Sequence, residues 1–157
     1  MSAPISPEEP LRGGCFCGAV SYALSAPPVL RAYCHCTQCQ RLNACPFIAT
    51  IHFSTPTFAW THAEPHENHL DAFINPTKPW KTRFRCKICG CTVASFNSKA
   101  NKVSIWGTQL ERDDAGKIKR WDIVKPTAHV FYETRTLDVN DGLGKWTGYE
   151  GQSMQII

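Results

Sequence analysis

The sequence predicts a mostly β protein folded as a single domain, and three observations support this prediction. Short segments alternate apolar and polar residues, which is the pattern of a half-buried strand. Proline and glycine separate these segments, as at Gly13-Gly14 and Pro27-Pro28. Amphipathic helical periodicity is scarce. A chain of 157 residues with 43% hydrophobic and 19% charged residues is long enough to bury one core and has a globular composition.

The individual elements follow from these patterns in chain order. After Gly18, the residues Val20, Tyr22 and Leu24 fall on one face of a first strand. Residues 38–44 favour one or two helical turns. Five further segments are rich in aromatic and β-branched residues and are predicted as strands, over residues 47–53, 81–85, 92–96, 102–106 and 128–132.

The two ends of this pattern set the expected domain bounds. Residues 1–10 hold three prolines and two glutamates, which favours a flexible N-terminal lead-in. Residues 11–157 are expected to form one domain. The lead-in lacks the basic and apolar regions of a signal peptide, so we expect a cytoplasmic protein, with a nuclear location as the alternative. No segment approaches the roughly 18 apolar residues that span a bilayer.

The formal charge of +4 is modest. The densest basic stretch alternates with other residues, as on a solvated strand face; it comprises Lys78, Lys81, Arg83, Arg85 and Lys87. A nucleic-acid surface would show a stronger basic excess with aromatic residues placed for stacking, so we do not expect a nucleic-acid partner. Alternatively, these cations balance negative charge on nearby thiolates.

Cysteine is the most informative residue type in this chain. There are nine cysteines, an odd number, and in a reducing compartment such a pattern indicates metal binding or catalysis rather than disulfides. Eight of them fall in three clusters: Cys15 and Cys17; Cys34, Cys36 and Cys39; and Cys86, Cys89 and Cys91. Cys45 stands apart and is expected to be an ordinary buried thiol.

Two of the clusters have the form of zinc-binding turns. Cys86-x-x-Cys89 is followed by Gly90 and Cys15-x-Cys17 by Gly18, and glycine permits the tight turn that presents two thiolates on one side of the backbone. Together the pairs supply the four ligands of a structural zinc. The alternative is buried free cysteines that pack as small apolar residues.

The middle cluster offers three thiolates within six residues. Three protein ligands with an open fourth position are typical of a catalytic zinc, so Cys34, Cys36 and Cys39 are candidate ligands of a functional metal. A second structural zinc is the alternative, closed by Cys45 or Cys91. His35 adjoins two of the ligands, and we expect its ring to be forced away from the same metal.

The three motifs, in this order and spacing, resemble the glutathione-dependent formaldehyde-activating enzyme family, which includes the centromere protein V domain. The matching residues are Gly13-Gly14-Cys15-x-Cys17-Gly18, Cys34-His35-Cys36-x-x-Cys39-Gln40-Arg41 and Phe84-x-Cys86-x-x-Cys89-Gly90. The resemblance spans roughly residues 11–132 and implies an Mss-four-like coiled β-sheet fold with two zinc ions per chain. It implies the same division of ligands, and residues 125–151 resemble fungal members.

The resemblance also implies a reaction. In the family, glutathione adds to formaldehyde, which makes the enzyme a carbon–sulfur lyase in the reverse direction. A zinc held by three thiolates suits this chemistry, because it stabilises a substrate thiolate better than it acidifies water. Arg41 is a candidate anchor for a glutathione carboxylate, or else balances the cysteine charge. His129 is a candidate acid–base group, or else an ordinary core histidine.

Other interpretations stay open. The same site could act on another thiol or electrophile, and both zinc ions could be structural in a non-catalytic interaction module like that of centromere protein V. His62, His66 and His69 lie in a polar segment that we expect to be a surface loop, with a histidine metal site as the alternative. The tryptophans Trp60, Trp80, Trp106 and Trp121 could line a pocket, but aromatic residues at strand spacing usually belong to the core.

Overall fold

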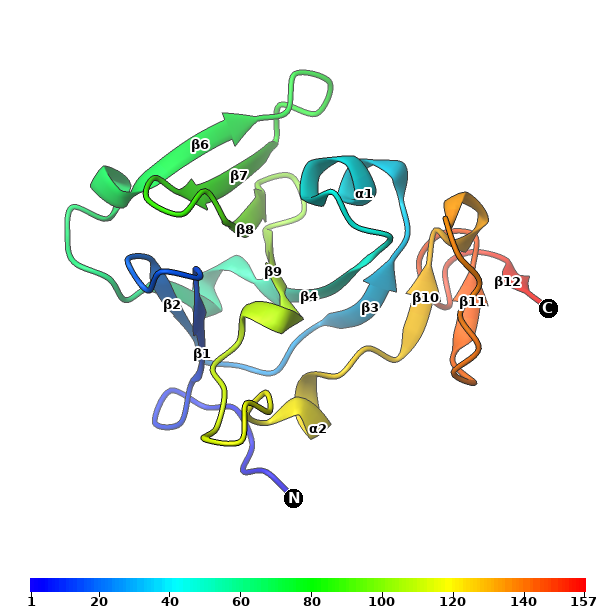
Figure 1. Cartoon of the computed structure of the whole chain (residues 1–157), viewed down its shortest axis with the longest axis horizontal. Helices are drawn as coiled ribbons and strands as arrows, with labels where there is room; N and C mark the ends of the chain where they lie inside the picture. Colours follow the sequence, from blue (N-terminus) through cyan, green and yellow to red (C-terminus); the bar gives the residue numbers. More distant parts are fainter.

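The computed structural model describes all 157 residues and confirms the mostly β prediction. A small sheet contains β1 (Leu11–Gly14), β2 (Ser21–Leu24) and β5 (Phe58–Trp60) in the order β1-β2-β5. The large sheet has nine strands in the order β12-β11-β10-β3-β4-β9-β8-β7-β6 (Figure 1). Their bounds are β3 Leu30–Cys34, β4 Ile48–Ser54, β6 Leu70–Ile74, β7 Lys81–Cys86, β8 Thr92–Asn97, β9 Lys102–Trp106, β10 Ala128–Val130, β11 Gly144–Trp146 and β12 Gln155–Ile156.

Helix is confined to short segments. The two α-helices are α1 (Thr37–Asn43) and α2 (Trp121–Val124), and the 3-10 turns are η1 (Thr55–Thr57), η2 (His66–His69), η3 (Gly107–Gln109) and η4 (Tyr132–Thr134). Strand pairing is antiparallel except at β10, which runs parallel to both β3 and β11. Neither α-helix has the length and apolar character of a membrane-spanning segment.

The predicted strands match the structure with small shifts at their ends. The segment predicted over 47–53 is β4, and those over 81–85, 92–96 and 102–106 are β7, β8 and β9. The strand predicted over 128–132 stops at Val130 because Phe131 has a left-handed backbone (φ 53°) and caps the start of η4. The predicted helix over 38–44 is α1, which ends where Ala44 turns left-handed (φ 49°).

The main core lies between the two sheets. Tyr22 and Leu24 of the small sheet are fully buried, and they belong to the same apolar cluster as Ile51 and Phe53 of β4. Burial of each such side chain stabilises the fold by about 1.5–3 kcal/mol. The core therefore fixes which face of the large sheet points inward.

Strand alternation gives the large sheet a second, polar face. In β4, Ile51 and Phe53 enter the core, whereas Thr50 and His52 point to the opposite side. The neighbouring strands repeat this division in register, since Thr50 pairs with Trp106 and His52 pairs with Ser104. The cavity described below is built on this polar face.

The first ten residues are attached to the domain. Ile5 is buried in the main core. The Arg120 side chain donates hydrogen bonds to the carbonyl oxygens of Ala3 and Glu9, each 2.7 Å long. The segment predicted as a flexible lead-in therefore packs along the domain.

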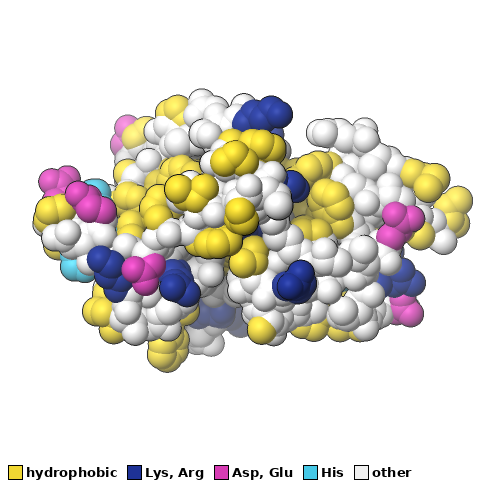
Figure 2. All heavy atoms as spheres, turned by 90° about the horizontal axis from the view of Figure 1, so that it is seen from above, with side chains coloured by type: hydrophobic (Ala, Val, Ile, Leu, Met, Phe, Trp, Pro, Cys, Tyr) yellow, Lys and Arg dark blue, Asp and Glu magenta, His cyan; other side chains and the backbone are white.

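Charged side chains are dispersed on the surface shown in Figure 2. Lys and Arg lie scattered among neutral and apolar side chains on this face and form no continuous basic patch.

Candidate functional site

Four cysteine sulfurs meet in one cluster, as the sequence predicted. The Sγ atoms of Cys15, Cys17, Cys86 and Cys89 all lie within 4.8 Å of one another. The Cys15–Cys17 and Cys17–Cys86 sulfurs are 3.6 and 3.7 Å apart. A tetrahedral zinc with bonds of about 2.3 Å to sulfur requires sulfur–sulfur separations of about 3.8 Å. The arrangement therefore fits a zinc ion held by four thiolates.

Two glycine turns build this cluster. Gly18 and Gly90 have positive φ angles of 83° and 74°, which is the conformation for which glycine was expected after each cysteine pair. The backbone N–H of Val20 donates to the Cys15 sulfur at 3.3 Å, and that of Ile88 donates to the Cys86 sulfur at 3.4 Å. Such N–H donors stabilise thiolate ligands. The cluster joins the β1–β2 turn to the β7–β8 turn.

The second cluster contains Cys34, Cys36 and Cys39, whose Sγ atoms also lie within 4.8 Å of one another. Cys34 ends β3 and Cys36 is the N-cap of α1, where its sulfur accepts the Cys39 backbone N–H at 3.3 Å. Hydrogen bonds with the Cys34 and Cys39 thiols hold the pKa of Cys36 far below its usual value. Three sulfurs this close together are the arrangement of cysteines around one metal ion, so these residues fit a metal ion as well.

The other candidate ligands lie outside both clusters. The His35 ring is fully buried and turns away, as expected, to hydrogen-bond His129 across 2.8 Å between their ring nitrogens. The Cys45 thiol donates to the carbonyl oxygen of Phe47. Cys91 adjoins the four-cysteine cluster without being one of its four members. The second cluster therefore has three protein sulfurs and no fourth.

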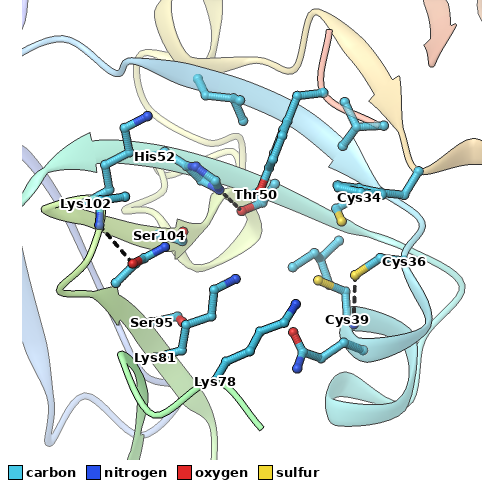
Figure 3. A pocket seen from close by; sticks show the side chains of 18 of the residues that line it. Cys34, Cys36, Cys39, Thr50, His52, Lys78, Lys81, Ser95, Lys102 and Ser104 are labelled. Atoms are coloured by element: carbon cyan, nitrogen blue, oxygen red, sulfur yellow. Dashed lines mark hydrogen bonds between the residues drawn. The ribbon is translucent and has the colours of Figure 1, made fainter. Parts of the chain in front are cut away.

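The three-cysteine cluster opens into a cavity of about 650 Å³ on the polar face of the large sheet (Figure 3). Strands β3, β4, β7, β8 and β9, together with α1 and the segment after β11, supply its walls. Four cationic side chains line it and no carboxylate does; they are Lys78, Lys81, Arg83 and Lys102. In Figure 3, Lys102 lies across the cavity from the cysteines, and Lys78 and Lys81 point into it.

The most constrained of these cations is Arg83. Its residue is only 8% exposed, and Nη2 donates to the Gln38 Oε1 at 3.3 Å. Its Nε and Nη1 atoms are buried without any hydrogen-bond partner. Leaving a buried donor unpaired costs about 1–3 kcal/mol. These two donors are closed to solvent and lie on different sides of the guanidinium, so Arg83 acts on the cavity through its positive charge.

The electrostatic potential is positive in the part of the cavity lined by the four cations. Burial, and then the neighbouring Lys78 and Arg83 charges, lower the pKa of Lys81. Burial together with the charges of Lys102 and Lys81 lowers the pKa of His52 to about 4, so this ring is neutral at pH 7. A bound anion would relieve this repulsion.

The basic stretch 78–87 is therefore divided rather than solvated throughout. Lys78, Lys81 and Arg83 line the cavity, which corrects the expectation of a solvated face. Arg85 fits that expectation, because its side chain is 61% exposed and forms a 3.7 Å ion pair with Asp71. The alternating pattern predicted that Lys81, Arg83 and Arg85 share one strand face. It could not predict that α1 and the adjoining strands enclose part of that face.

Neither of the two other proposed site residues lines the cavity. Arg41 is exposed on α1. His129 is fully buried, and its Nε2 donates to the Asp141 Oδ2 at 2.8 Å while its Nδ1 faces His35. This is the arrangement of a core histidine whose two nitrogens are both satisfied.

The histidine segment behaves as a structural loop. The His62 ring packs against the rings of His66 and His69, with centroids 5.0 and 5.3 Å apart. Its nitrogens are occupied by backbone groups of Ser21 and His66. These histidines do not form a group of metal-ligand atoms.

Sequence reasoning missed several cavity residues. His52 and Lys102 carried a usable signal, since each alternates with core residues in a predicted strand. Tyr149 and Gln152 carried none, because they reach the cavity from the turn between β11 and β12. Among the tryptophans, Trp106 lines the cavity, whereas Trp60 and Trp121 pack against the core.

Among the comparisons with known proteins, the match to a family model includes this site. No curated protein matches the chain. A Rhodobacter sphaeroides protein of known crystal structure is 18% identical, with 68% of this chain and 96% of that protein covered and a TM-score of 0.49. The model of the family described as glutathione-dependent formaldehyde-activating enzyme matches residues 10–134, which include both cysteine clusters. This chain therefore belongs to the glutathione-dependent formaldehyde-activating enzyme family.

Proposed function

We propose that this protein forms and cleaves a carbon–sulfur bond between an anionic thiol of the glutathione type and formaldehyde or another small electrophile. The observation that carries the proposal is the cavity, where three cysteine sulfurs face a wall of four cations with no carboxylate. A neutral or cationic thiol would gain nothing from such a wall. Family membership supports glutathione as the thiol.

Zinc would be held by Cys34, Cys36 and Cys39, and when bound it would stabilise a substrate thiolate while leaving it nucleophilic. The remaining tasks fall to the protein. Arg83 attracts one carboxylate of the thiol substrate through its positive charge at the cavity wall. Lys81 and Lys102 attract a second carboxylate. Two anchored carboxylates would fix the position of the sulfur, which converts binding energy into orientation of the reacting atoms.

A matched pair of variants on β7 tests this assignment. Arg83→Gln removes a buried cation from the cavity, and Arg85→Gln removes an exposed cation two residues further along. With the zinc-loaded protein, calorimetry should show at least about tenfold weaker glutathione binding for Arg83→Gln, because attraction between opposite charges about 4 Å apart contributes about 1–4 kcal/mol. Arg85→Gln should bind like the wild type.

Catalysis is measured separately. Exchange NMR on mixtures of glutathione and formaldehyde gives the rate at which the hydroxymethyl thioether forms and breaks. The wild-type protein should accelerate this exchange, and Arg83→Gln should lose most of the acceleration. Absence of acceleration by the wild-type protein, with or without glutathione binding, would refute the proposal.

A further inference from the structure

The turn between β11 and β12 brings one aromatic residue to the cavity from outside the family match. Residues 10–134 match the family model, whereas Tyr149 lies after β11 and lines the same cavity as the three cysteines. Its ring packs edge-on against His52 and Phe131, with centroids 6.3 and 5.2 Å apart. These contacts hold the ring at the polar face of the large sheet.

The backbone around Tyr149 is well anchored. Its carbonyl oxygen accepts from the Gln152 backbone N–H at 3.1 Å and from the Ser153 hydroxyl at 2.9 Å. Gly148 accepts a backbone hydrogen bond from Phe131. A side chain on a tight, hydrogen-bonded turn has a defined position, which is what a reacting group requires.

The phenol hydroxyl is left free by these contacts. Every hydrogen bond at Tyr149 goes to its backbone oxygen, and its hydroxyl, unlike that of Tyr22, is not among the buried atoms without a partner. The Tyr149 side chain is about one-third exposed, so its hydroxyl can be reached from the cavity. The phenol therefore faces the cavity that the three cysteines also line, and it carries its proton at neutral pH because the ordinary pKa of tyrosine is about 10.

We propose that Tyr149 is a catalytic residue that donates its hydroxyl hydrogen bond to the carbonyl oxygen of the electrophile during carbon–sulfur bond formation. This inference rests on the proposed function. The thiolate sulfur attacks the carbonyl carbon, the carbon–sulfur bond forms, and the carbon–oxygen π electrons move to oxygen. That oxygen takes the phenol proton, and the phenol recovers a proton from water. The thiol had released one proton to water, so the overall reaction is balanced addition of thiol to carbonyl.

A hydrogen-bond donor aimed at developing negative charge acts mainly on the rate. Removing one such donor typically lowers the rate about 100-fold or more. It has little effect on binding of the thiol, which Arg83 and the lysines anchor elsewhere in the cavity. Tyr149→Phe keeps the ring and its packing but removes the donor.

The experiment compares Tyr149→Phe with a matched control, Tyr33→Phe. Tyr33 stacks on His129 and does not line the cavity. For each zinc-loaded protein we would measure the enzyme-dependent rate of thioether exchange by NMR, the glutathione Kd by calorimetry, the zinc content and the melting temperature. Tyr149→Phe should lower the rate about 100-fold, with the Kd, zinc content and melting temperature unchanged. Tyr33→Phe should keep the wild-type rate and Kd.

Two results would overturn the assignment. A Tyr149→Phe rate within twofold of wild type shows that the hydroxyl does not take part. A slower rate accompanied by an equal loss of glutathione affinity or zinc shows that Tyr149 only supports the site. If the wild type binds glutathione without accelerating exchange, the proposed function itself fails. The wild-type measurement alone separates this outcome from a failure of the Tyr149 assignment.

Discussion

The two cysteine clusters use the same ligand chemistry but differ in how the chain reaches them. The four-cysteine cluster joins Cys17 to Cys86, 69 residues apart in sequence, whereas the three-cysteine cluster lies between Cys34 and Cys39. Closing the longer loop removes about 2 kcal/mol more conformational entropy from the unfolded chain. The long-range cluster is therefore suited to stabilising the fold. The local cluster constrains little of the chain and opens into a cavity, which suits it to chemistry.

The largest expected effect comes from breaking the four-cysteine cluster. Cys89→Ser should remove one zinc per chain and unfold most of the domain, because zinc binding of this kind contributes on the order of 10 kcal/mol, comparable to the 5–15 kcal/mol that stabilises a typical domain. Circular dichroism and metal analysis measure the two effects. Cys45→Ser, at a thiol outside both clusters, is the control and should keep both metals.

A smaller effect on folding is expected at the three-cysteine cluster. Cys36→Ser should remove one zinc and the activity while leaving the domain folded. Serine is itself a preferred N-cap, so it can replace the Cys36 sulfur in capping α1. The melting temperature and the zinc content decide the matter. Unfolding as complete as that of Cys89→Ser would show that both clusters are structural and that they do not differ in role.

Acid sensitivity should appear on the cavity side. The pKa of His52 is lowered from about 6.5 to about 4 by burial and by Lys102 and Lys81, so the unfolded chain takes up this proton at a higher pH than the folded protein. The contribution of His52 is fully present above pH 6.5 and is lost as the pH falls toward 4.

From pH 7 to pH 5 this linkage removes about 2 kcal/mol. His52→Gln should lose correspondingly less stability over the same range when unfolding is followed in denaturant. Since both proteins share the cysteine clusters, acid effects on the thiolates cancel in the difference. Equal losses in the two proteins would show that His52 titrates normally in the folded state.

The smallest effect is expected at Arg41. This side chain is exposed on α1 and does not line the cavity, so Arg41→Ala should change the glutathione Kd by less than about twofold, as exposed charges contribute about 0–1 kcal/mol. Calorimetry that measures the glutathione Kd of Arg41→Ala and of Arg83→Gln under the same conditions tests this prediction. A loss as large as that of Arg83→Gln would move the thiol site toward the outer surface of the helix.

Spacing along the sequence was enough to predict both clusters. Gly18 and Gly90 marked the turns, and a pair of thiols on a tight turn requires a second pair, which made the long-range partnership predictable. The strand alternation likewise placed Val20, Tyr22 and Leu24 on one strand face, and all three are buried in the core. These features depend on local backbone geometry and on the number of ligands, and both can be inferred from residue types and their spacing.

The cavity could not be predicted from local sequence patterns. Arg83 and Arg85 have the same parity on β7, but only the first is covered by neighbouring elements. Arg41 was favoured because it adjoins the cysteines in sequence, whereas Arg83 reaches the same region from a strand more than forty residues away and contacts Gln38 of α1. Tyr149 enters from a still more distant turn. Contacts between residues so far apart in the sequence are determined by the order of strands in the sheet, and sequence spacing does not reveal them.

The two-faced strands also bear on how this protein can change over evolutionary time. Val103 and Ile105 fill the core, while Lys102 and Ser104 of the same strand face the cavity. Substitutions at the cavity positions can alter the preferred thiol or electrophile without disturbing the packing. A one-residue insertion or deletion within β9 would exchange the two sets, burying a lysine and lining the cavity with aliphatic groups. New specificities in this sheet should therefore arise by point substitution, and length variation should be confined to its turns.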